Sequence, residues 1–451
     1  MFMIRKKKLL LLGLSMSTMF AFGQSLSIRQ CIDYATKNSQ NQKIAGYELV
    51  VAKQKIKEQI GSMLPQIDGS ASYINNLKLQ KSVLPGAMFG SPTDLTITMG
   101  TQYNGAAGLQ LTQKIFDPTF TVALKAAKLN QEYYQQNQQK VLEQTVYKVC
   151  SSYYQCLIIT KQYSKLQATL ASTEKLLAIT ELKFKNGMAN KIDLDKIRVS
   201  YNSVHSQLDQ CDLNYKQSLN SLKFEMGMPV ETAIVLSDTT SVEINIDGAL
   251  NVVKNGFNVD DLIDFRLKKT NLKAQELQKR QHVMGYLPTL NFSAGYNYNA
   301  IRKEFNFFDQ NLPWYNSSNI GFSLKVPVFD GFQRKSRIEQ SKMNVLIAKE
   351  NVNVMEQSIK LNIANYEMQY KDAIDNIRNE KENFELAQSV YANSQLQYKE
   401  GLGSALDLVQ AESSLRESQN NYFNKLFSLF IARLDLEQSK GTLMNYVNNF
   451  K

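Results

Sequence analysis

The sequence predicts a mainly α-helical protein with a β-barrel part. Long antiparallel coiled-coil helices are expected to form an α-barrel, and four transmembrane β-strands per chain to form part of the β-barrel. Three observations predict this class. Short motifs recur in the same order in both halves of the 451-residue chain. Each half holds a long proline-free stretch with a seven-residue apolar repeat. Four shorter segments alternate apolar and polar residues, as strands do.

The chain begins with a predicted signal peptide. Arg5 to Lys8 are basic, Leu9 to Phe20 form a short apolar run, and Ala21 and Gly23 supply small residues at a cleavage point. The run is too short to span a bilayer comfortably, which favours cleavage over retention as a membrane anchor. We therefore expect residues 1–23 to be removed on export.

Duplicated motifs set the expected domain organisation. The matching motifs are Leu64-Pro65 with Leu287-Pro288, Ile115-Phe116-Asp117 with Val328-Phe329-Asp330, and Phe184 to Met188 with Tyr398 to Leu402. The first copy is about ten residues longer, which predicts an extra loop between residues 74 and 100. We expect a first repeat at 24–230 (helix, two strands, long helical hairpin), an equatorial connecting segment at 231–258, a second repeat at 259–445 and a C-terminal tail at 446–451. Short strands are expected in the connecting segment at 233–236 and 242–246.

The proline-free stretches predict long helices. In the first copy we expect a helix over about 119–185, a short turn and an antiparallel helix over about 191–228, with shorter helices at about 27–62 and 260–285. At 1.5 Å per residue the longest helix extends about 100 Å, more than a compact domain can house. A heptad stripe lies at equivalent places in both copies: Val149, Cys156, Tyr163, Leu170, Leu177 and Phe184, and Ile363, Tyr370, Ile377, Phe384, Tyr391 and Tyr398. This spacing is typical of coiled-coil packing.

Helix geometry bears on the four cysteines, Cys31, Cys150, Cys156 and Cys211. In an antiparallel hairpin that turns near residue 188, Cys211 lies roughly 22 Å along the axis from Cys150 and roughly 13 Å from Cys156. A disulfide requires Cα atoms within about 7 Å. We therefore expect buried free thiols within this hairpin, while the state of Cys31 stays open.

Four segments have the period of strands, and each is about ten residues long, which is enough to cross a bilayer when tilted. Their apolar positions are Ile67, Ala71 and Tyr73; Tyr103, Ala107, Leu109, Leu111 and Ile115; Leu290, Phe292, Ala294, Tyr296 and Tyr298; and Ile320, Phe322, Leu324, Val326 and Val328. Aromatic residues near the strand ends, such as Tyr73, Phe116, Tyr298 and Phe329, are typical of interfacial girdles. A soluble sheet with one wet face would show the same alternation; the export signal and the long helices favour membrane strands.

Four strands are too few to close a barrel, because single-chain barrels begin at about eight strands. An open sheet edge in lipid leaves backbone groups without partners. The sequence therefore predicts that the chain associates with copies of itself.

The motifs quoted above resemble the TolC-like family of outer-membrane efflux and secretion channels. The resemblance covers nearly the whole mature chain and rests on Leu64-Pro65, Phe116-Asp117, Gly187 with Asp193, and their partners in the second copy, which include Gly401 with Asp407. It implies a homotrimer whose twelve strands form one barrel and whose twelve helical columns form a periplasmic tunnel. It also implies contact with outer-membrane lipid, a periplasmic membrane-fusion adaptor and an inner-membrane pump of the RND or ABC type.

The resemblance also implies roles for the two helix turns. Gly187, Met188, Ala189 and Asn190, and Gly401, Leu402, Gly403 and Ser404, would be the tips on which the adaptor docks. Glycine at these points is also an ordinary helix C-cap, and both roles are compatible. Asp407 would line the narrowed tunnel mouth, and Asp193 with Tyr398 would help to hold it shut. Each aspartate also lies in the first turn of a helix, where the helix dipole stabilises a carboxylate.

The expected function is that of a passive exit duct in the outer membrane, with a large periplasmic portion, that conducts small molecules or drugs. Type I protein secretion is an alternative on the same fold, and a secreted coiled-coil scaffold without a pore is an alternative of another class. We expect no enzyme, cofactor or metal site, since His205 and His282 are far apart in sequence and no catalytic set is evident. Removal of the signal peptide takes away four of the 52 cations and leaves 48 against 41 acidic residues, and this net charge of +7 is spread over a long chain, so no nucleic-acid partner is expected.

Overall fold

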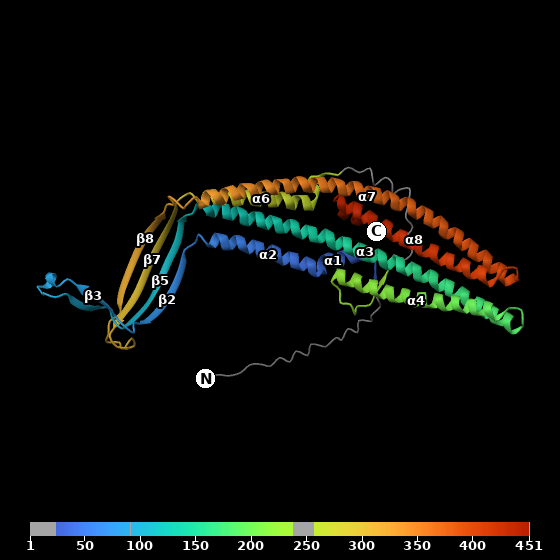
Figure 1. Ribbon diagram of the computed structural model, residues 1–451, viewed down its shortest axis with the longest axis horizontal. Helices are drawn as coiled ribbons and strands as arrows, with labels where there is room; N and C mark the ends of the chain where they lie inside the picture. The colour runs from blue at the N-terminus through green and yellow to red at the C-terminus, as the bar shows by residue number, and fades with distance from the viewer. Residues whose placement is uncertain (1–23, 91, 238–256, 451) are drawn as a thin grey trace, which may run out of the picture. The chain divides into compact units, whose positions relative to one another are not determined.

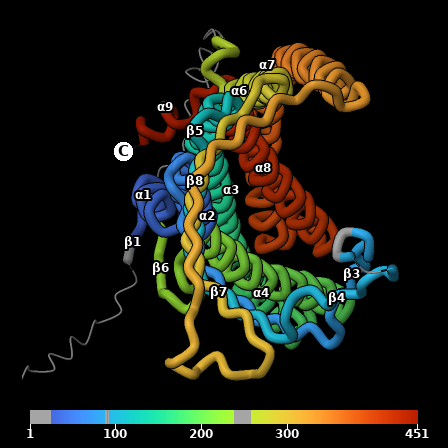
Figure 2. The backbone as a smooth tube through the Cα atoms, turned by 90° about the vertical axis from the view of Figure 1, so that its left-hand side faces the viewer, coloured from blue at the N-terminus to red at the C-terminus, as the bar shows by residue number. Residues whose placement is uncertain are grey.

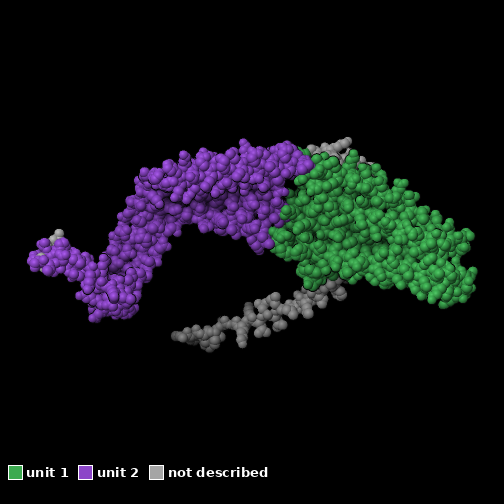
Figure 3. Space-filling model, in the orientation of Figure 1, with its two compact units in different colours: residues 1–43, 142–257, 362–451 green, residues 44–141, 258–361 purple. Residues whose placement is uncertain are grey.

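The computed structural model describes residues 24–90, 92–237 and 257–450. The predicted signal peptide and the predicted strand at 242–246 lie outside these ranges. The chain divides into two compact units (Figure 3). Unit 1 comprises residues 1–43, 142–257 and 362–451, and unit 2 comprises residues 44–141 and 258–361. Each unit is built from both halves of the sequence.

Two long helical hairpins account for nearly half of the chain (Figure 1). Helix α3 (Pro118–Lys185) and helix α7 (Gln333–Glu400) have 68 residues each. They are followed by the antiparallel helices α4 (Lys191–Met226) and α8 (Ala405–Ser439). The predicted helices at about 119–185 and 191–228 are thereby confirmed. In the described ranges, no helix combines the length and the apolar character that a membrane crossing requires.

Local sequence signals explain where these helices begin. The carboxylate of Asp117 accepts a hydrogen bond from the Thr119 amide at 3.0 Å, and Pro118 occupies the first helical position of α3, where its missing N–H costs nothing. Asn190 and Ser404 cap α4 and α8 by accepting from the amides of Asp193 and Asp407.

Shorter helices accompany the hairpins: α1 (Ile28–Asn38), α2 (Gln40–Gly61), α6 (Ile263–Met284) and α9 (Leu443–Asn448). The single helix expected at about 27–62 is wrong in one respect, because it is broken at Ser39, which adopts φ −53° and ψ 133°. Gly227, the C-cap of α4, lies against this break. A Cβ on Gly227 would be 2.6 Å from the Asn38 carbonyl oxygen, so the break and the glycine allow two backbones to meet. Helix α9 includes residues 446–448, the first half of the segment expected as a tail.

The main sheet contains β2 (Gln66–Asn75), β5 (Tyr103–Phe116), β7 (Thr289–Arg302) and β8 (Tyr315–Lys325). The order is β2-β5-β7-β8 and every pair is antiparallel (Figure 1). Two predicted details are wrong. Ile115 was expected to continue the apolar row of β5, but the register shifts between Lys114 and Phe116, and Phe116 pairs with Leu290. Strand β8 ends at Lys325, before Pro327, which has no N–H to donate to a ladder.

The described residues also form two separate strand pairs. The segment 74–100, expected to hold an extra loop, contains a hairpin of β3 (Gln80–Leu84) and β4 (Leu95–Met99), joined by the 3₁₀ turn η1 (Gly86–Phe89). In unit 1, β1 (Gln24–Leu26) pairs in parallel with β6 (Ile234–Leu236) near α1 (Figure 2). Strand β6 confirms the strand expected at 233–236, whereas β1 was not predicted.

The core of unit 1 follows the predicted stripe in one copy better than in the other. In the second copy Ile363, Tyr370, Ile377, Tyr391 and Tyr398 are all buried. In the first copy Val149 and Cys156 are fully buried, but Phe184 is 40% exposed. Farther along α3 the buried positions are Leu166, Thr169, Thr173, Leu176 and Thr180. Each of these threonine hydroxyls donates to a carbonyl four residues earlier in the helix, so burial leaves no hydroxyl donor unpaired.

The four cysteines are buried, and they form no disulfide with one another. Cys31, Cys150 and Cys156 belong to one hydrophobic cluster, which confirms the expectation that no disulfide forms within the first hairpin. The Cys156 thiol donates to the Ser218 hydroxyl at 3.3 Å. Burial raises the pKa of Cys156 to about 11 and raises the pKa of Cys150 further still.

Candidate functional site

The main sheet of unit 2 has two chemically different faces, which its register defines because directly paired residues share a face. Ile67 pairs with Leu111, Leu111 with Ala294 and Ala294 with Ile320. We call this side the apolar face, with Ile67, Leu109, Leu111, Ala294, Tyr296, Tyr298, Ile320, Phe322 and Leu324. The opposite side is the polar face, with Gln66, Asp68, Ser70, Gln110, Thr112, Ser293, Asn297, Asn299, Ser317 and Asn319. Ile74 and Ile301 are apolar exceptions near one end of the polar face.

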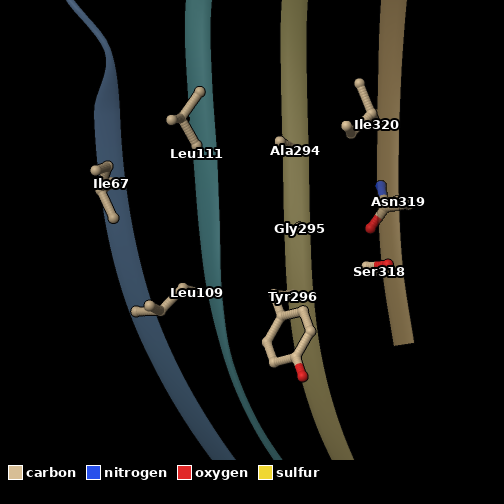
Figure 4. Close-up of a pocket in the computed structure, with 9 residues that line it drawn as sticks. All are labelled: Ile67, Leu109, Leu111, Ala294, Gly295, Tyr296, Ser318, Asn319 and Ile320. Carbon is tan, nitrogen blue, oxygen red and sulfur yellow. The ribbon is translucent and has the colours of Figure 1, made fainter. Parts of the chain in front are cut away.

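The apolar face is open to the surroundings in the single chain. Ile67 is 65% exposed, Ile320 75% and Phe322 70%, although these are the side chains that the hydrophobic effect most strongly withdraws from water. A shallow hollow crosses this face where the small residue Ala294 of β7 lies between larger side chains of β5 and β8 (Figure 4). An exposed apolar surface of this extent marks an interaction site.

The predicted tip residues form the two turns of unit 1. Gly187 and Gly401 have φ values of 71° and 78°, the left-handed region that favours glycine. The Met188 amide donates back to the Lys183 carbonyl at 2.7 Å, and the Leu402 amide to the Gln397 carbonyl at 2.8 Å, which closes each helix. A Cβ on either glycine would meet nothing within 4 Å, whereas on Gly403 it would lie 3.3 Å from the Tyr398 nitrogen.

The tips also present apolar side chains to solvent. Met188 is 75% exposed and Leu402 is 84% exposed, while Ala189 is half-buried. Asn190 and Ser404 complete the turns as N-caps. Each tip therefore combines an uncrowded glycine with one large apolar group, which is a suitable surface for a partner helix.

The predicted gate residues are held by contacts that the sequence did not indicate. Tyr398 is 6% exposed, and its hydroxyl lies 3.2 Å from the Thr180 hydroxyl. The Lys183 ammonium donates to the carbonyls of Tyr398 and Lys399, at 3.0 and 3.1 Å. Its Nζ also lies 5.2 Å from the centre of the Tyr398 ring. Lys183 of α3 thus caps the C-terminal end of α7, where the helix dipole favours a cation.

The two predicted gate aspartates mainly contact their own helix caps. The half-buried Asp193 donates its amide to Asn190 Oδ1 at 2.8 Å. The exposed Asp407 accepts from the Ser404 hydroxyl at 2.7 Å and donates its amide to the same oxygen at 3.1 Å. Within the described part of one chain, the Tyr398 hydroxyl contacts Thr180 rather than Asp193. The gate role of these aspartates therefore stays a prediction.

A buried polar cluster joins α4 to α8 above the tips. Glu412 is 1% exposed, accepts a hydrogen bond from the Ser200 hydroxyl and lies 3.7 Å from the Arg416 guanidinium. Arg416 in turn donates to the Ser203 hydroxyl at 3.0 Å. Burial raises the pKa of Glu412 above its ordinary value, although Ser200 and Arg416 both oppose the shift. Burial also raises the pKa of Tyr391 of α7, and the nearby charge of Glu412 raises the pKa of this tyrosine further.

Lys183 and Glu412 are not among the site residues predicted from the sequence, for different reasons. Glu412 interrupts a line of buried positions, Ala405, Leu408, Leu415 and Phe423, so a charge in that line was a usable signal. No comparable signal points to Lys183, because its acceptors are 215 and 216 residues away in the sequence.

A sheet with one exposed apolar face, joined to hairpins of 68-residue helices, defines the class of outer-membrane channel proteins. The chain matches the family model described as "Outer membrane efflux protein" over residues 31–228 and 264–442, and it belongs to that family. It is an outer-membrane efflux channel of the TolC type, as the motifs in its sequence indicated.

Named relatives agree with this assignment. Outer membrane protein TolC of Salmonella enteritidis is 22% identical over 468 residues, which covers 98% of this chain and 87% of the relative. TolC of Escherichia coli is 23% identical, with coverages of 97% and 87%. Among solved structures, VceC of Vibrio cholerae has a TM-score of 0.68 at 17% identity, with coverages of 92% and 96%. The CmeC channel of Campylobacter jejuni has a TM-score of 0.69 at 16% identity, with coverages of 92% and 86%. The two structural likenesses show the fold.

Proposed function

We propose that three copies of the chain form a passive exit duct, which carries small molecules from an inner-membrane pump and a periplasmic membrane-fusion adaptor to the exterior. The duct performs no catalysis in this proposal. The observation that carries it is the exposed apolar face of a sheet that has only four strands in the described part of the chain. Such a face is stable in lipid, but its edges are not.

The two edge strands support association. Within the described residues, β2 pairs only with β5, and β8 pairs only with β7, so each offers an unpaired backbone edge. Pairing β8 of one copy with β2 of the next satisfies both edges, and three copies give a closed barrel of twelve strands. The apolar face then meets lipid, and the polar face with Asp68 lines the water-filled interior.

The test of assembly is crosslinking of the full chain in native membranes, followed by mass measurement in mild detergent. A trimer is the expected product. A monomer that survives with its fold intact would overturn the proposal. Cysteine placed at Ser70 of β2 and at Ser317 of β8, both on the polar face, should link copies, whereas the Ser70→Cys variant alone should not.

The proposed adaptor contact can be tested at Gly187, because its role in the turn after α3 and its proposed role in docking can be changed separately. Asparagine tolerates positive φ, and the Cβ of a side chain at this position would have no described atom within 4 Å. The Gly187→Asn variant should therefore fold and insert normally, yet lose drug efflux in a host without its own duct. Gly90→Asn is the control, since Gly90 also has positive φ (68°) and open surroundings, in the β3–β4 hairpin. Normal efflux with Gly187→Asn would reject docking at this tip.

A further inference from the structure

The loop between β7 and β8, residues 303–314, carries aromatic side chains that gather against the sheet. The ring centre of Phe305 lies 5.6 Å from Tyr73 and 6.2 Å from Tyr103, and that of Phe307 lies 5.6 Å from Tyr73. Trp314 lies 6.3 Å from Phe307. We call Tyr73, Tyr103, Phe305, Phe307 and Trp314 the aromatic collar.

Strand register shows on which side of the sheet the collar lies. Tyr73 pairs with Gly105, and Gly105 with Ala300, in a row that continues the apolar face. A Cβ on Gly105 would lie 2.9 Å from the Phe307 ring and 3.5 Å from the Trp314 ring. The loop therefore folds onto the apolar face, and the absence of a side chain at Gly105 provides its seat.

The loop is fixed in this position by Arg302, the last residue of β7. Its side chain is 6% exposed, and Nη2 donates to the Pro313 carbonyl at 2.8 Å across the base of the loop. This contact joins the two ends of the loop on the same face of the sheet as Tyr103, with which Arg302 is paired. The aromatic collar is therefore held in a defined position on the sheet by contacts within the chain.

The collar keeps much of its aromatic surface outward. Phe305 is 60% exposed, the neighbouring Phe308 is 88% exposed and Trp314 is 40% exposed. Charged residues, Lys303, Glu304 and Asp309, are interspersed with them in the loop. The loop lies at the end of the sheet away from the junctions with α2 and α3 (Figure 1). Aromatic groups mixed with charges are typical of the boundary between headgroups and acyl chains.

We propose that the aromatic collar is a lipid anchor that inserts into the outer-leaflet interface from the outside of the barrel wall. It does not cover the mouth of the pore. The inference rests on the proposed function, in which the apolar face meets lipid. We infer that the partner of the collar is also lipid, because the collar is continuous with that face.

Trp314 is the single tryptophan of the chain, so its fluorescence reports on the collar directly. The full chain is reconstituted in phosphatidylcholine vesicles with or without brominated acyl chains. We expect brominated lipid to quench Trp314, and aqueous acrylamide to quench it weakly. Two reference proteins lack the native tryptophan through Trp314→Phe. The first also carries Phe322→Trp, on the apolar face, and the second carries Tyr315→Trp, at a position that pairs with Asn299 on the polar face. The first should be quenched by lipid and the second by acrylamide.

The quenching results distinguish the lipid-anchor proposal from the proposed function. If brominated lipid quenches the Phe322→Trp reference but not Trp314, only the lipid-anchor proposal is overturned. Strong quenching of Trp314 by acrylamide would then show that the loop covers the pore, and no quenching of Trp314 by either agent would show that a neighbouring copy covers it. Absence of lipid quenching in both proteins overturns the membrane sheet itself.

A second variant tests the seat. Gly105→Ala places a Cβ against Phe307, so Trp314 should lose lipid quenching, whereas Gly69→Ala on the same face meets only Leu109 at 3.6 Å and should not. Equal quenching in the two variants contradicts the seat.

Discussion

The Lys183 ammonium lies 3.0 Å from the carbonyl oxygen of Tyr398 and joins the end of one long helix to the end of the other. The contact uses the negative end of the α7 dipole and requires no carboxylate partner. It places a cation beside the tyrosine that the family resemblance assigned to the closed tunnel mouth. Two hairpin tips of one chain are thus held together by a side chain that forms no ion pair with the residues described in the structure.

Replacing Lys183 with methionine should loosen this contact. The variant keeps the aliphatic stem but removes the ammonium, at a cost of about 1 kcal/mol in the stability of the closed tips. We expect a higher single-channel conductance in planar bilayers. Lys185→Met, in the same last turn but exposed, is the control and should leave conductance unchanged. Identical conductance in the two variants would show that Lys183 does not hold the tips.

Glu412 should give the helical region a distinctive pH dependence. Its native pKa is raised by burial, so the native state binds a proton in a pH window where the unfolded chain has released it. The stabilisation is fully present below the ordinary pKa of glutamate and is lost as pH rises through the native pKa. We expect the thermal stability of the protein relative to Glu412→Gln to increase as pH is lowered toward 5.

The matched control for this measurement is Glu417→Gln, which changes an exposed carboxylate on the same helix. Its stability relative to the unmodified protein should show little dependence on pH over the same range. If the difference in thermal stability between the protein and the Glu412→Gln variant stays constant from pH 8 to pH 5, Glu412 is not the source of the pH dependence.

Asp407 is predicted to make the channel cation-selective. Three symmetric copies of one exposed carboxylate form a ring that attracts cations. Asp407→Asn can still accept from the Ser404 hydroxyl, so the helix cap is preserved while the charge is lost. Reversal potentials in a salt gradient should shift toward zero for this variant and not for Asp195→Asn, an exposed site on α4. Unchanged selectivity in Asp407→Asn speaks against the ring.

The cysteines should be inert in the native protein. The thiolate is the reactive form, and burial with a raised pKa disfavours it in Cys150 and Cys156. A thiol reagent at pH 8 should label none of the four in the folded protein, and all four after unfolding without reductant. Fewer than four thiols after unfolding would reveal a disulfide.

Much of the fold was predictable because its signals are local. The alternation from Leu290 to Tyr298 defines two faces, since side chains in a strand point to opposite sides. The seven-residue stripe from Ile363 to Tyr398 predicts a buried seam. In the structure every residue of this stripe is buried except Phe384, which is half-buried. In α3 the seam moves onto Thr173 and Thr180, which an apolar pattern does not count although their hydroxyls are satisfied within the helix.

Other features were not predictable from local patterns. Strand β1 has three residues and forms only because β6, more than two hundred residues later, lies beside it. The break at Ser39 has no proline or glycine next to it, and it coincides with the close approach of Gly227. The loop containing Trp314 reads as a polar-aromatic connection, and its seat on Gly105 depends on strand pairing across the sheet.

By itself, the sequence determined the duplication, the lengths of the long helices and the two faces of the membrane sheet. Those properties depend on periodicity and on capping residues such as Asn190 and Ser404, which act within a few residues. Only the tertiary structure decided that Lys183 caps α7, that Glu412 is buried against Ser200 and that the collar lies on the apolar face. These contacts join side chains that are distant in sequence, so their energies depend on how the helices and strands pack and not on any local pattern.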